Sequence, residues 1–180
     1  IDHVARLAIS PAQDRNPGGE VLAAMWPTTG ASNICPDTPL RLLLGAPAML
    51  GNSGKVIVTR VSDHKVVDVV DVGSEEQVNL FGTKTLRYTP IRVDGNDVII
   101  QLHSHVLDSN ATYSVTLDPS VFKFDPHLTF AGITNGQWQF TTRAPLPKGR
   151  TRLEVAPDSL GDFCTLQGAV DYIPEDNYTP

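Results

Sequence analysis

Two histidines separated by one residue form the clearest metal-binding pattern in this sequence. His103 and His105 follow a run of apolar and β-branched residues, and at a strand end two side chains at this spacing point to the same side. A zinc site needs at least three protein ligands, and the sequence places no third ligand beside this pair. We therefore interpret both histidines as solvated surface residues, and we expect no bound metal and no cofactor.

Three aspartates near the end of the chain could supply the paired carboxylates that acid and base catalysis requires. Their surroundings favour structural roles, with Asp158 in a turn, Asp162 as a helix cap and Asp171 on the solvated face of a helix. The hydroxyls of Ser120 and Ser159 have no evident base partner, so the sequence gives little support to a serine nucleophile. We assign no catalytic residue in this chain.

Cys35 and Cys164 are the only cysteines of the chain. They fall in two segments that we interpret as separate units, so a disulfide between them stays open but is not expected. Cys164 is flanked by the apolar residues Phe163 and Leu166, which favours a small buried hydrophobic side chain over a reactive thiol.

Exposed aromatic side chains could stack on sugar rings. Tyr88, Phe122, Phe124 and Phe130 are candidates for such stacking. The three phenylalanines are accompanied by apolar neighbours, which favours packing of their loop onto the rest of the chain. Tyr88, Phe122 and Phe124 are kept as the candidates for glycan contact, with packing as the preferred interpretation.

The composition indicates short strands joined by many turns. The 180 residues are 41% hydrophobic and include 14 glycines and 14 prolines, which favours an all-β chain. The net charge is −6, and no basic run could follow a phosphate backbone, so nucleic acid is not an expected partner. No stretch approaches the roughly 20 apolar residues of a membrane-spanning helix, so a membrane is not expected either.

Seven runs of alternating or β-branched residues are predicted to be strands. They cover residues 40–44, 55–61, 65–72, 85–93, 97–103, 113–117 and 137–142. Two hairpin turns are predicted, at Ser62-Asp63-His64 and at Asp94-Gly95-Asn96. In the second, the Asp-Gly pair supplies the positive φ that a tight turn needs. Residues 74–84 are predicted to form an exposed loop. The expected core residues are Trp26, Leu42, Leu44, Val58, Ile99, Tyr113, Val115, Trp138 and Phe140.

The motifs along residues 24–143 resemble those of bacterial Ig-like modules that are appended to secreted enzymes and surface proteins. Trp26-Pro27 and Gly30-Ala31 match an opening Pro-x-x-Gly-Ala turn, and Trp138-Gln139-Phe140-Thr141-Thr142 matches a closing Trp-x-Phe-Thr-Thr strand. Two further matching motifs lie between them. They are Cys35-Pro36-Asp37-Thr38-Pro39-Leu40 and Asn110-Ala111-Thr112-Tyr113-Ser114-Val115. The resemblance implies an Ig-like β-sandwich, and the number and spacing of the predicted strands are typical of that fold.

Residues 150–174 predict a short strand, a turn and an amphipathic helix. Leu153 and Val155 alternate with charged residues, as in a half-buried strand, and either Asp162 or Thr165 can cap the helix that follows the turn. The apolar positions that recur at helical spacing are Leu166, Ala169, Val170 and Ile173.

This last segment resembles the opening of the pectin methylesterase family (pectinesterases). Gly161-Asp162-Phe163-Cys164-Thr165, Gln167-Gly168-Ala169-Val170-Asp171 and Pro174 carry the match, which covers about the last thirty residues. The resemblance implies the first strand and the capping helix of a right-handed parallel β-helix, whose end needs a cap with a polar outer face. Leu166, Ala169, Val170 and Ile173 would then face the first coil, and Gln167, Asp171 and Glu175 would stay in water.

The second resemblance also implies a function. The chain would be the amino-terminal part of a secreted bacterial carbohydrate esterase that removes methyl esters from pectin, a plant cell-wall polysaccharide. Members of the family look to use one aspartate as nucleophile and another as general acid and base, with no metal. We expect those residues on later coils, so that this chain by itself is inactive. The alternative is a non-catalytic Ig-like spacer, adhesion module or polysaccharide-binding module, and a third interpretation is the cap of a different β-helix protein.

These interpretations divide the chain into four parts. Residues 1–22 are a leader, residues 23–143 the Ig-like sandwich, residues 144–149 a linker and residues 150–180 the β-helix cap. The linker contains Pro145 and Pro147, which favour extended backbone. The chain begins at Ile1 with no charged start and no long apolar run, so we expect any secretion signal to have been removed, which fits an exported protein and equally a fragment. With the two resemblances, this favours a secreted or cell-surface protein.

Overall fold

The computed structural model of the chain describes residues 21–74, 78–81, 84–147, 150 and 152–173. Most of the predicted leader therefore lies outside the described residues. The regular secondary structure of the described chain is mostly β-strand with one short α-helix, which confirms the predicted all-β class. Within the described residues, no helix has both the length and the apolar character needed to cross a membrane.

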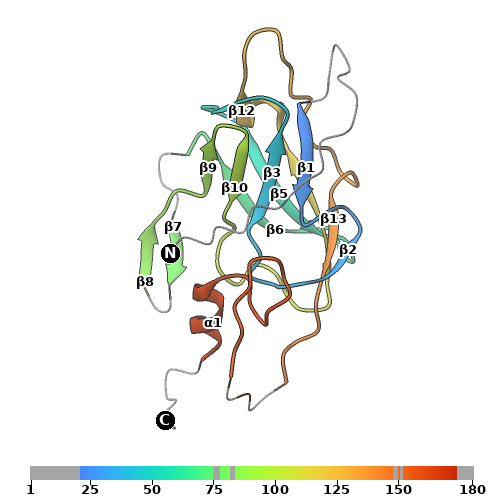
Figure 1. Ribbon diagram of the computed structural model, residues 1–180, viewed down its shortest axis with the longest axis vertical. Helices are drawn as coiled ribbons and strands as arrows, with labels where there is room; N and C mark the ends of the chain where they lie inside the picture. The colour runs from blue at the N-terminus through green and yellow to red at the C-terminus, as the bar shows by residue number, and fades with distance from the viewer. Residues whose placement is uncertain (1–20, 75–77, 82–83, 148–149, 151, 174–180) are drawn as a thin grey trace, which may run out of the picture.

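Nine strands form two sheets that face each other (Figure 1). The first sheet runs in the order β1 (Leu22–Trp26), β3 (Leu40–Leu44), β10 (Asp97–Ile100) and β9 (Ile91–Asp94). The second runs in the order β2 (Ala31–Ile34), β13 (Gln139–Thr142), β11 (Thr112–Leu117), β5 (Lys55–Arg60) and β6 (Lys65–Asp71). All neighbours are antiparallel except β13 and β2, which are parallel. We call residues 21–143 the two-sheet body.

Short elements complete the body. Two small two-stranded sheets pair β4 (Met49–Leu50) with β12 (Phe122–Lys123) and β7 (Val78–Phe81) with β8 (Lys84–Arg87). A single 3-10 turn, η1 (Pro119–Val121), precedes β12, and the helix α1 (Leu166–Tyr172) follows the sheets in the sequence.

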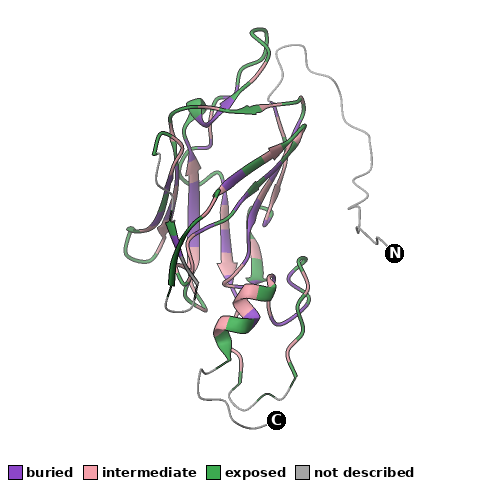
Figure 2. Cartoon of the chain, turned by 90° about the vertical axis from the view of Figure 1, so that its left-hand side faces the viewer, coloured by how far each residue is buried: buried purple, intermediate pink, exposed green. Residues whose placement is uncertain are grey.

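The core lies between the two sheets, and the alternation of each strand decides which side chains enter it. In β3, Leu40, Leu42 and Leu44 are buried while the residues between them are partly exposed, so this strand turns one face inward. Figure 2 shows buried residues along the strands of both layers. The largest fully buried side chains are Trp138, Tyr113 and Phe140, all on or beside the second sheet.

Most of the expected core residues are confirmed, and two are not. Trp26 is only partly buried. Ile99 is 37% exposed, whereas its neighbours Val98 and Ile100 are almost fully buried. Because side chains alternate along a strand, burying Val98 and Ile100 turns Ile99 to the outer face.

The predicted strand over residues 97–103 ends at Ile100, and one other strand and one loop were predicted wrongly. The predicted strand over residues 85–93 is divided into β8 and β9 by Tyr88-Thr89-Pro90, where Pro90 has no N–H for a ladder hydrogen bond. The predicted loop over residues 74–84 contains β7 and the start of β8. Both predicted hairpin turns are confirmed, with His64 at φ 56° and Gly95 at φ 62°.

The carboxyl-terminal segment forms a helix but not the expected strand. Val155 makes one isolated bridge to Phe163 and belongs to no strand, because no neighbouring extended chain pairs with it. Of the two predicted caps, Thr165 is the one observed, since its side chain accepts a hydrogen bond from the Gly168 N–H.

Trp138→Ala should destabilise the body by about 3–5 kcal/mol, because the ring is fully buried and leaves a large cavity. The substitution also removes the 2.7 Å hydrogen bond from Trp138 Nε1 to the Pro27 carbonyl. Urea unfolding measures the change. Ile99→Ala is the matched control, and its outward position predicts a loss below about 1 kcal/mol. Equal losses in the two variants would contradict the assigned register.

Candidate functional site

The carboxyl-terminal segment packs against one end of the two-sheet body instead of standing apart from it. Residues 154–172 lie beside residues 33–38, which join β2 to β3, and beside the loop of residues 101–107 (Figures 1 and 2). We call this region the junction. It gathers most of the candidate site residues of the sequence, so the site is built from here.

Arg143 holds the segment from the side of β13. Its guanidinium donates to the carbonyl oxygens of Ser159 and Gly161 in the segment and, at 3.2 Å, to that of Asn33 in the body. A planar guanidinium with several fixed N–H groups can bind carbonyls from two chains at once. Arg143 therefore satisfies backbone acceptors of a segment that has no sheet partner of its own.

Asp37, in the connection between β2 and β3, holds the start of α1. Its Oδ1 accepts from the Cys164 N–H at 3.0 Å, and its Oδ2 accepts from the N–H and the hydroxyl of Thr165 at 2.6 and 2.7 Å. A Cβ at position 168 would collide with the Asp37 carboxylate, which explains why Gly168 has no side chain. The carboxylate satisfies N–H groups at the beginning of the helix that the helix itself leaves without partners.

The two cysteines meet inside the junction. The Sγ atoms of Cys35 and Cys164 and a carboxylate oxygen of Asp37 all lie within 4.8 Å of one another. Both cysteines are free thiols, 0% and 5% exposed, and the Ser159 hydroxyl lies 3.0 Å from the Cys164 sulfur. The predicted burial of Cys164 is confirmed, but its neighbour is a second thiol and not only an apolar core.

The two thiols influence each other's ionisation. The hydrogen bond from Cys35 lowers the pKa of the Cys164 thiol, and the hydrogen bond to Cys164 together with burial raises the pKa of Cys35. Cys164 is therefore the sulfur of this pair that loses its proton first.

An open cleft of about 290 Å³ borders the junction. Its walls come from the loop of residues 101–107, from Asp37 and Thr38, and from the polar side of α1. His105 lies on one wall with Nε2 3.7 Å from Asp171 Oδ2. The lining mixes polar side chains with apolar ones such as Leu102, Val106 and Phe163.

The two histidines do not act as a pair. His103 Nδ1 lies 2.6 Å from Asp68 Oδ1, whereas His105 has φ 60° and contacts Asp171. In the part of the chain that the structure describes, the one cluster of three potential metal ligands is the Cys35, Asp37 and Cys164 set, which contains neither histidine.

The three carboxylates of the segment do not pair either. Asp158 Oδ1 accepts from the Leu160 N–H within a turn, as predicted. Asp162 does not cap α1; it accepts from the Glu154 N–H at 2.9 Å and binds the Arg150 guanidinium. Asp171 is not solvated, because its side chain is 10% exposed and accepts from Gln167 at 2.6 Å.

The predicted serines and aromatic residues take structural positions. Ser120 is exposed in η1, and Ser159 lies buried against a thiol and not a base. Phe122 is 4% exposed and packs edge-on against Phe130, so its ring face is not available to a sugar. Phe124 also packs on Phe130 and is partly buried, which is the packing role offered as the alternative. Tyr88 is partly buried against His103.

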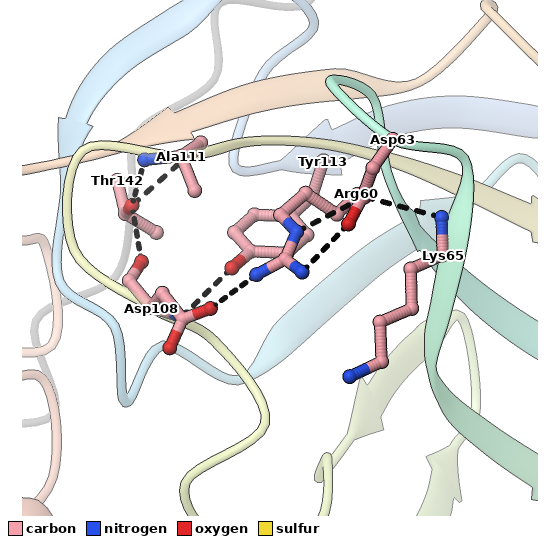
Figure 3. A network of polar contacts seen from close by, with 7 residues as sticks. All are labelled: Arg60, Asp63, Lys65, Asp108, Ala111, Tyr113 and Thr142. Carbon is pink, nitrogen blue, oxygen red and sulfur yellow. Dashed lines mark hydrogen bonds and ion pairs between the residues drawn. The ribbon is translucent and has the colours of Figure 1, made fainter.

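A polar network holds the chain just after the loop of residues 101–107. Figure 3 shows the Arg60 guanidinium between Asp63, at 2.8 and 3.1 Å, and Asp108, at 2.6 Å. The Asp108 N–H donates to the Tyr113 hydroxyl, and the Thr142 hydroxyl donates to the Asp108 carbonyl. The network ties β5, β11 and β13 to the residue at which the loop re-enters the body.

The junction itself was not predicted, because the sequence was divided at residues 144–149. One signal in the sequence pointed to it. The only two cysteines occur in the two most distinctive motifs, Cys35-Pro36-Asp37 and Asp162-Phe163-Cys164, so a contact between the motifs would bring the cysteines together.

Asp37→Ala should release the start of α1. The amides of Cys164 and Thr165 should exchange with deuterium roughly 10–100-fold faster, because hydrogen bonds to a charged group contribute about 1.5–3 kcal/mol. The Val115 amide, which is bonded to Trp138 inside the body, should keep its protection. Asp158→Ala is the control, since that carboxylate bonds only within its turn. Unchanged exchange in the Asp37 variant would show that the carboxylate does not hold the segment.

Asp63→Asn should lower Tm at neutral pH and have no effect in strong acid. The hydrogen bond from Arg60 lowers the pKa of Asp63 from 3.8 to about 2, so the folded state favours the ionised carboxylate. That stabilisation is complete above pH 3.8 and is lost as the pH falls towards 2. The Tm difference from wild type should therefore close over this interval. Asp94→Asn, at an exposed ion pair of 3.9 Å, is the control and should give no such pH-dependent difference.

The chain was compared with protein-family models, with curated proteins and with solved structures, and none of them matches it. What stands from the geometry is an all-β chain whose carboxyl-terminal segment is fixed to the end of two facing sheets.

Proposed function

We propose that this chain is a non-catalytic, Ig-like module that carries and orients the first part of a secreted pectinesterase-like domain. In this proposal the two-sheet body is the Ig-like sandwich, and residues 150–173 are the lead-in to a right-handed parallel β-helix. The enzyme that continues from it removes methyl esters from pectin or a related cell-wall polysaccharide.

The observation that carries the proposal is an apolar stripe on α1 that faces solvent. Leu166, Val170 and Ile173 are 72%, 53% and 45% exposed. Their spacing places them on one side of the helix. Leu160 in the preceding turn, at 85% exposed, adds to the apolar surface of the segment. Exposed apolar surface of this kind is typical of a site that another structure covers.

The opposite side of the helix is polar and faces the body, which reverses the usual arrangement of an amphipathic helix. Gln167 and Asp171 bond to each other beside the junction cleft, and Ala169 is 6% exposed. The sequence placed Gln167 and Asp171 in water, which is wrong for Asp171, whose side chain is 10% exposed, whereas Gln167 stays partly exposed. Ala169, which was placed against a coil, is already buried within the described chain. On the body side, His105 lies 3.7 Å from Asp171, and Asp37 fixes the start of the helix through Thr165.

The reversed helix supports a role as a connecting element. A helix fixed through its polar side leaves its apolar stripe for a second partner, and the proposed first coil of a β-helix needs an apolar cap over its open end. One helix would then bind the module on one side and the solenoid on the other. The module would set the position of the catalytic coils without touching the reacting ester.

The geometry also supports the non-catalytic part of the proposal. Ester hydrolysis needs a nucleophile, a proton donor and an oxyanion site that converge on one atom. Asp158 and Asp162 accept from backbone N–H groups, Asp171 accepts from Gln167, and Ser159 lies against a thiol. Ser120 is exposed in η1 and far from them in the sequence. No catalytic residue is proposed in this chain.

Methanol release from methyl-esterified pectin tests this function. The 180-residue chain should release none, whereas a product of the same gene that continues past Pro180 should release methanol. Release by the short chain would contradict the non-catalytic role. A longer product that folds but releases no methanol would remove the esterase from the proposal.

A second candidate function is polysaccharide binding near Tyr88. A shallow cleft of about 240 Å³ contains Tyr88, Arg87 and Pro90, which join β8 to β9. An aromatic ring beside a cation suits an acidic sugar. A pull-down on insoluble pectin tests it. Binding that is lost in Tyr88→Ala and kept in Phe122→Leu would favour a binding module, and no retention of the wild type would exclude binding at this cleft.

A further inference from the structure

We propose that Cys35 and Cys164 form a disulfide that joins the carboxyl-terminal segment to the two-sheet body. The inference rests on the junction and does not depend on the proposed esterase. With only two cysteines in the chain, this is the one intramolecular pairing available.

The geometry brings the sulfurs close from two independently fixed backbones. The Cys35 N–H donates to the Ser159 hydroxyl at 3.4 Å, and the Cys164 N–H donates to Asp37 Oδ1 at 3.0 Å. Each cysteine is thus tied to a residue next to its partner. The two sulfurs lie within 4.8 Å, and a disulfide bond of about 2 Å requires side-chain rotation and a small approach of the chains.

The position of the pair gives the bond a structural effect. Cys35 follows the edge strand β2, and Cys164 precedes α1, so the bond would close a loop that contains nearly the whole body. A covalent link across such a long loop restricts the unfolded chain strongly. It would also keep α1 in place when the hydrogen bonds of Arg143 and Asp37 open.

The oxidant in this proposal is a small disulfide such as oxidised glutathione. The Cys164 thiolate attacks one sulfur of that disulfide, a new bond forms to Cys164, and one glutathione thiolate leaves. Cys35 then loses its proton and attacks Cys164 Sγ, which expels the second glutathione thiolate. The two protein thiols lose two electrons and two protons in total, and the oxidant is reduced to two thiols. Because both thiols are buried, this exchange takes place before the segment docks or while it is transiently released.

A metal ion explains the same cluster less well. Zinc would need the Asp37 carboxylate as a ligand together with the two sulfurs. Both oxygens of that carboxylate already accept hydrogen bonds, three in all, from Cys164 and Thr165. Asp37 is engaged in holding α1, which leaves the two sulfurs to each other.

The test equilibrates the folded chain in buffers of oxidised and reduced glutathione and then counts free thiols. After acid quenching, denaturation and alkylation, the oxidised sample should contain no alkylated cysteine, and its intact mass should be lower by two hydrogen atoms. A peptide map should show Cys35 and Cys164 joined, and a non-reducing gel should show a monomer. A reductant should lower Tm by roughly 5–15 °C.

Cys35→Ser and Cys164→Ser are the matched variants, and the Tm of each should not respond to reductant. The thiol count on the wild-type chain needs neither variant, so the test stands even if they fold poorly. Two alkylated cysteines, a stable glutathione adduct or an intermolecular dimer in the oxidised sample would overturn the proposal. Retention of one zinc per reduced chain after dialysis, with both thiols protected from alkylation, would assign the pair to a metal and overturn it as well.

Discussion

The attachment of the carboxyl-terminal segment to the body is the constraint on which the rest of the structure depends. The segment has almost no regular hydrogen bonding of its own, with one isolated bridge and a helix of two turns. Its buried backbone groups therefore need partners from elsewhere. Arg143, directly after β13, supplies donors, and Asp37, between β2 and β3, supplies acceptors. Arg143 and Asp37 together therefore hold the irregular carboxyl-terminal segment in one position on the body.

That attachment explains the unusual orientation of α1. A helix on a folded domain normally buries its apolar side. Here Asp37 fixes the start of the helix and His105 lies beside Asp171, while the apolar stripe faces out. The same contact brings two thiols together, because each cysteine lies within two residues of Asp37 or of the helix cap. The proposed connecting role and the proposed disulfide both follow from this one docking arrangement.

Much of the fold could be predicted from local pattern. The alternation of Leu40, Leu42 and Leu44 and the Asp-Gly turn after β9 fix a strand and a hairpin by short-range rules, and the structure confirms both. Short-range rules wrongly predicted a buried Ile99, because both faces of β10 carry apolar residues. Val98, Ile99 and Ile100 are all apolar, so only packing against the opposite sheet decides which of them turn inward.

The sequence by itself determined the all-β class, the existence of α1 with a cap at Asp162 or Thr165, and the burial of Cys164, since each follows from residue type and spacing over a few positions. The structure then selected Thr165 as the cap. Only the tertiary structure decided the junction. The contacts of Asp37 with Thr165 and of Asn33 with Arg143 join residues more than a hundred positions apart, and no local pattern encodes such a meeting. Hydrogen bonds of this range form only when the sheets have closed and placed the ends of their strands side by side.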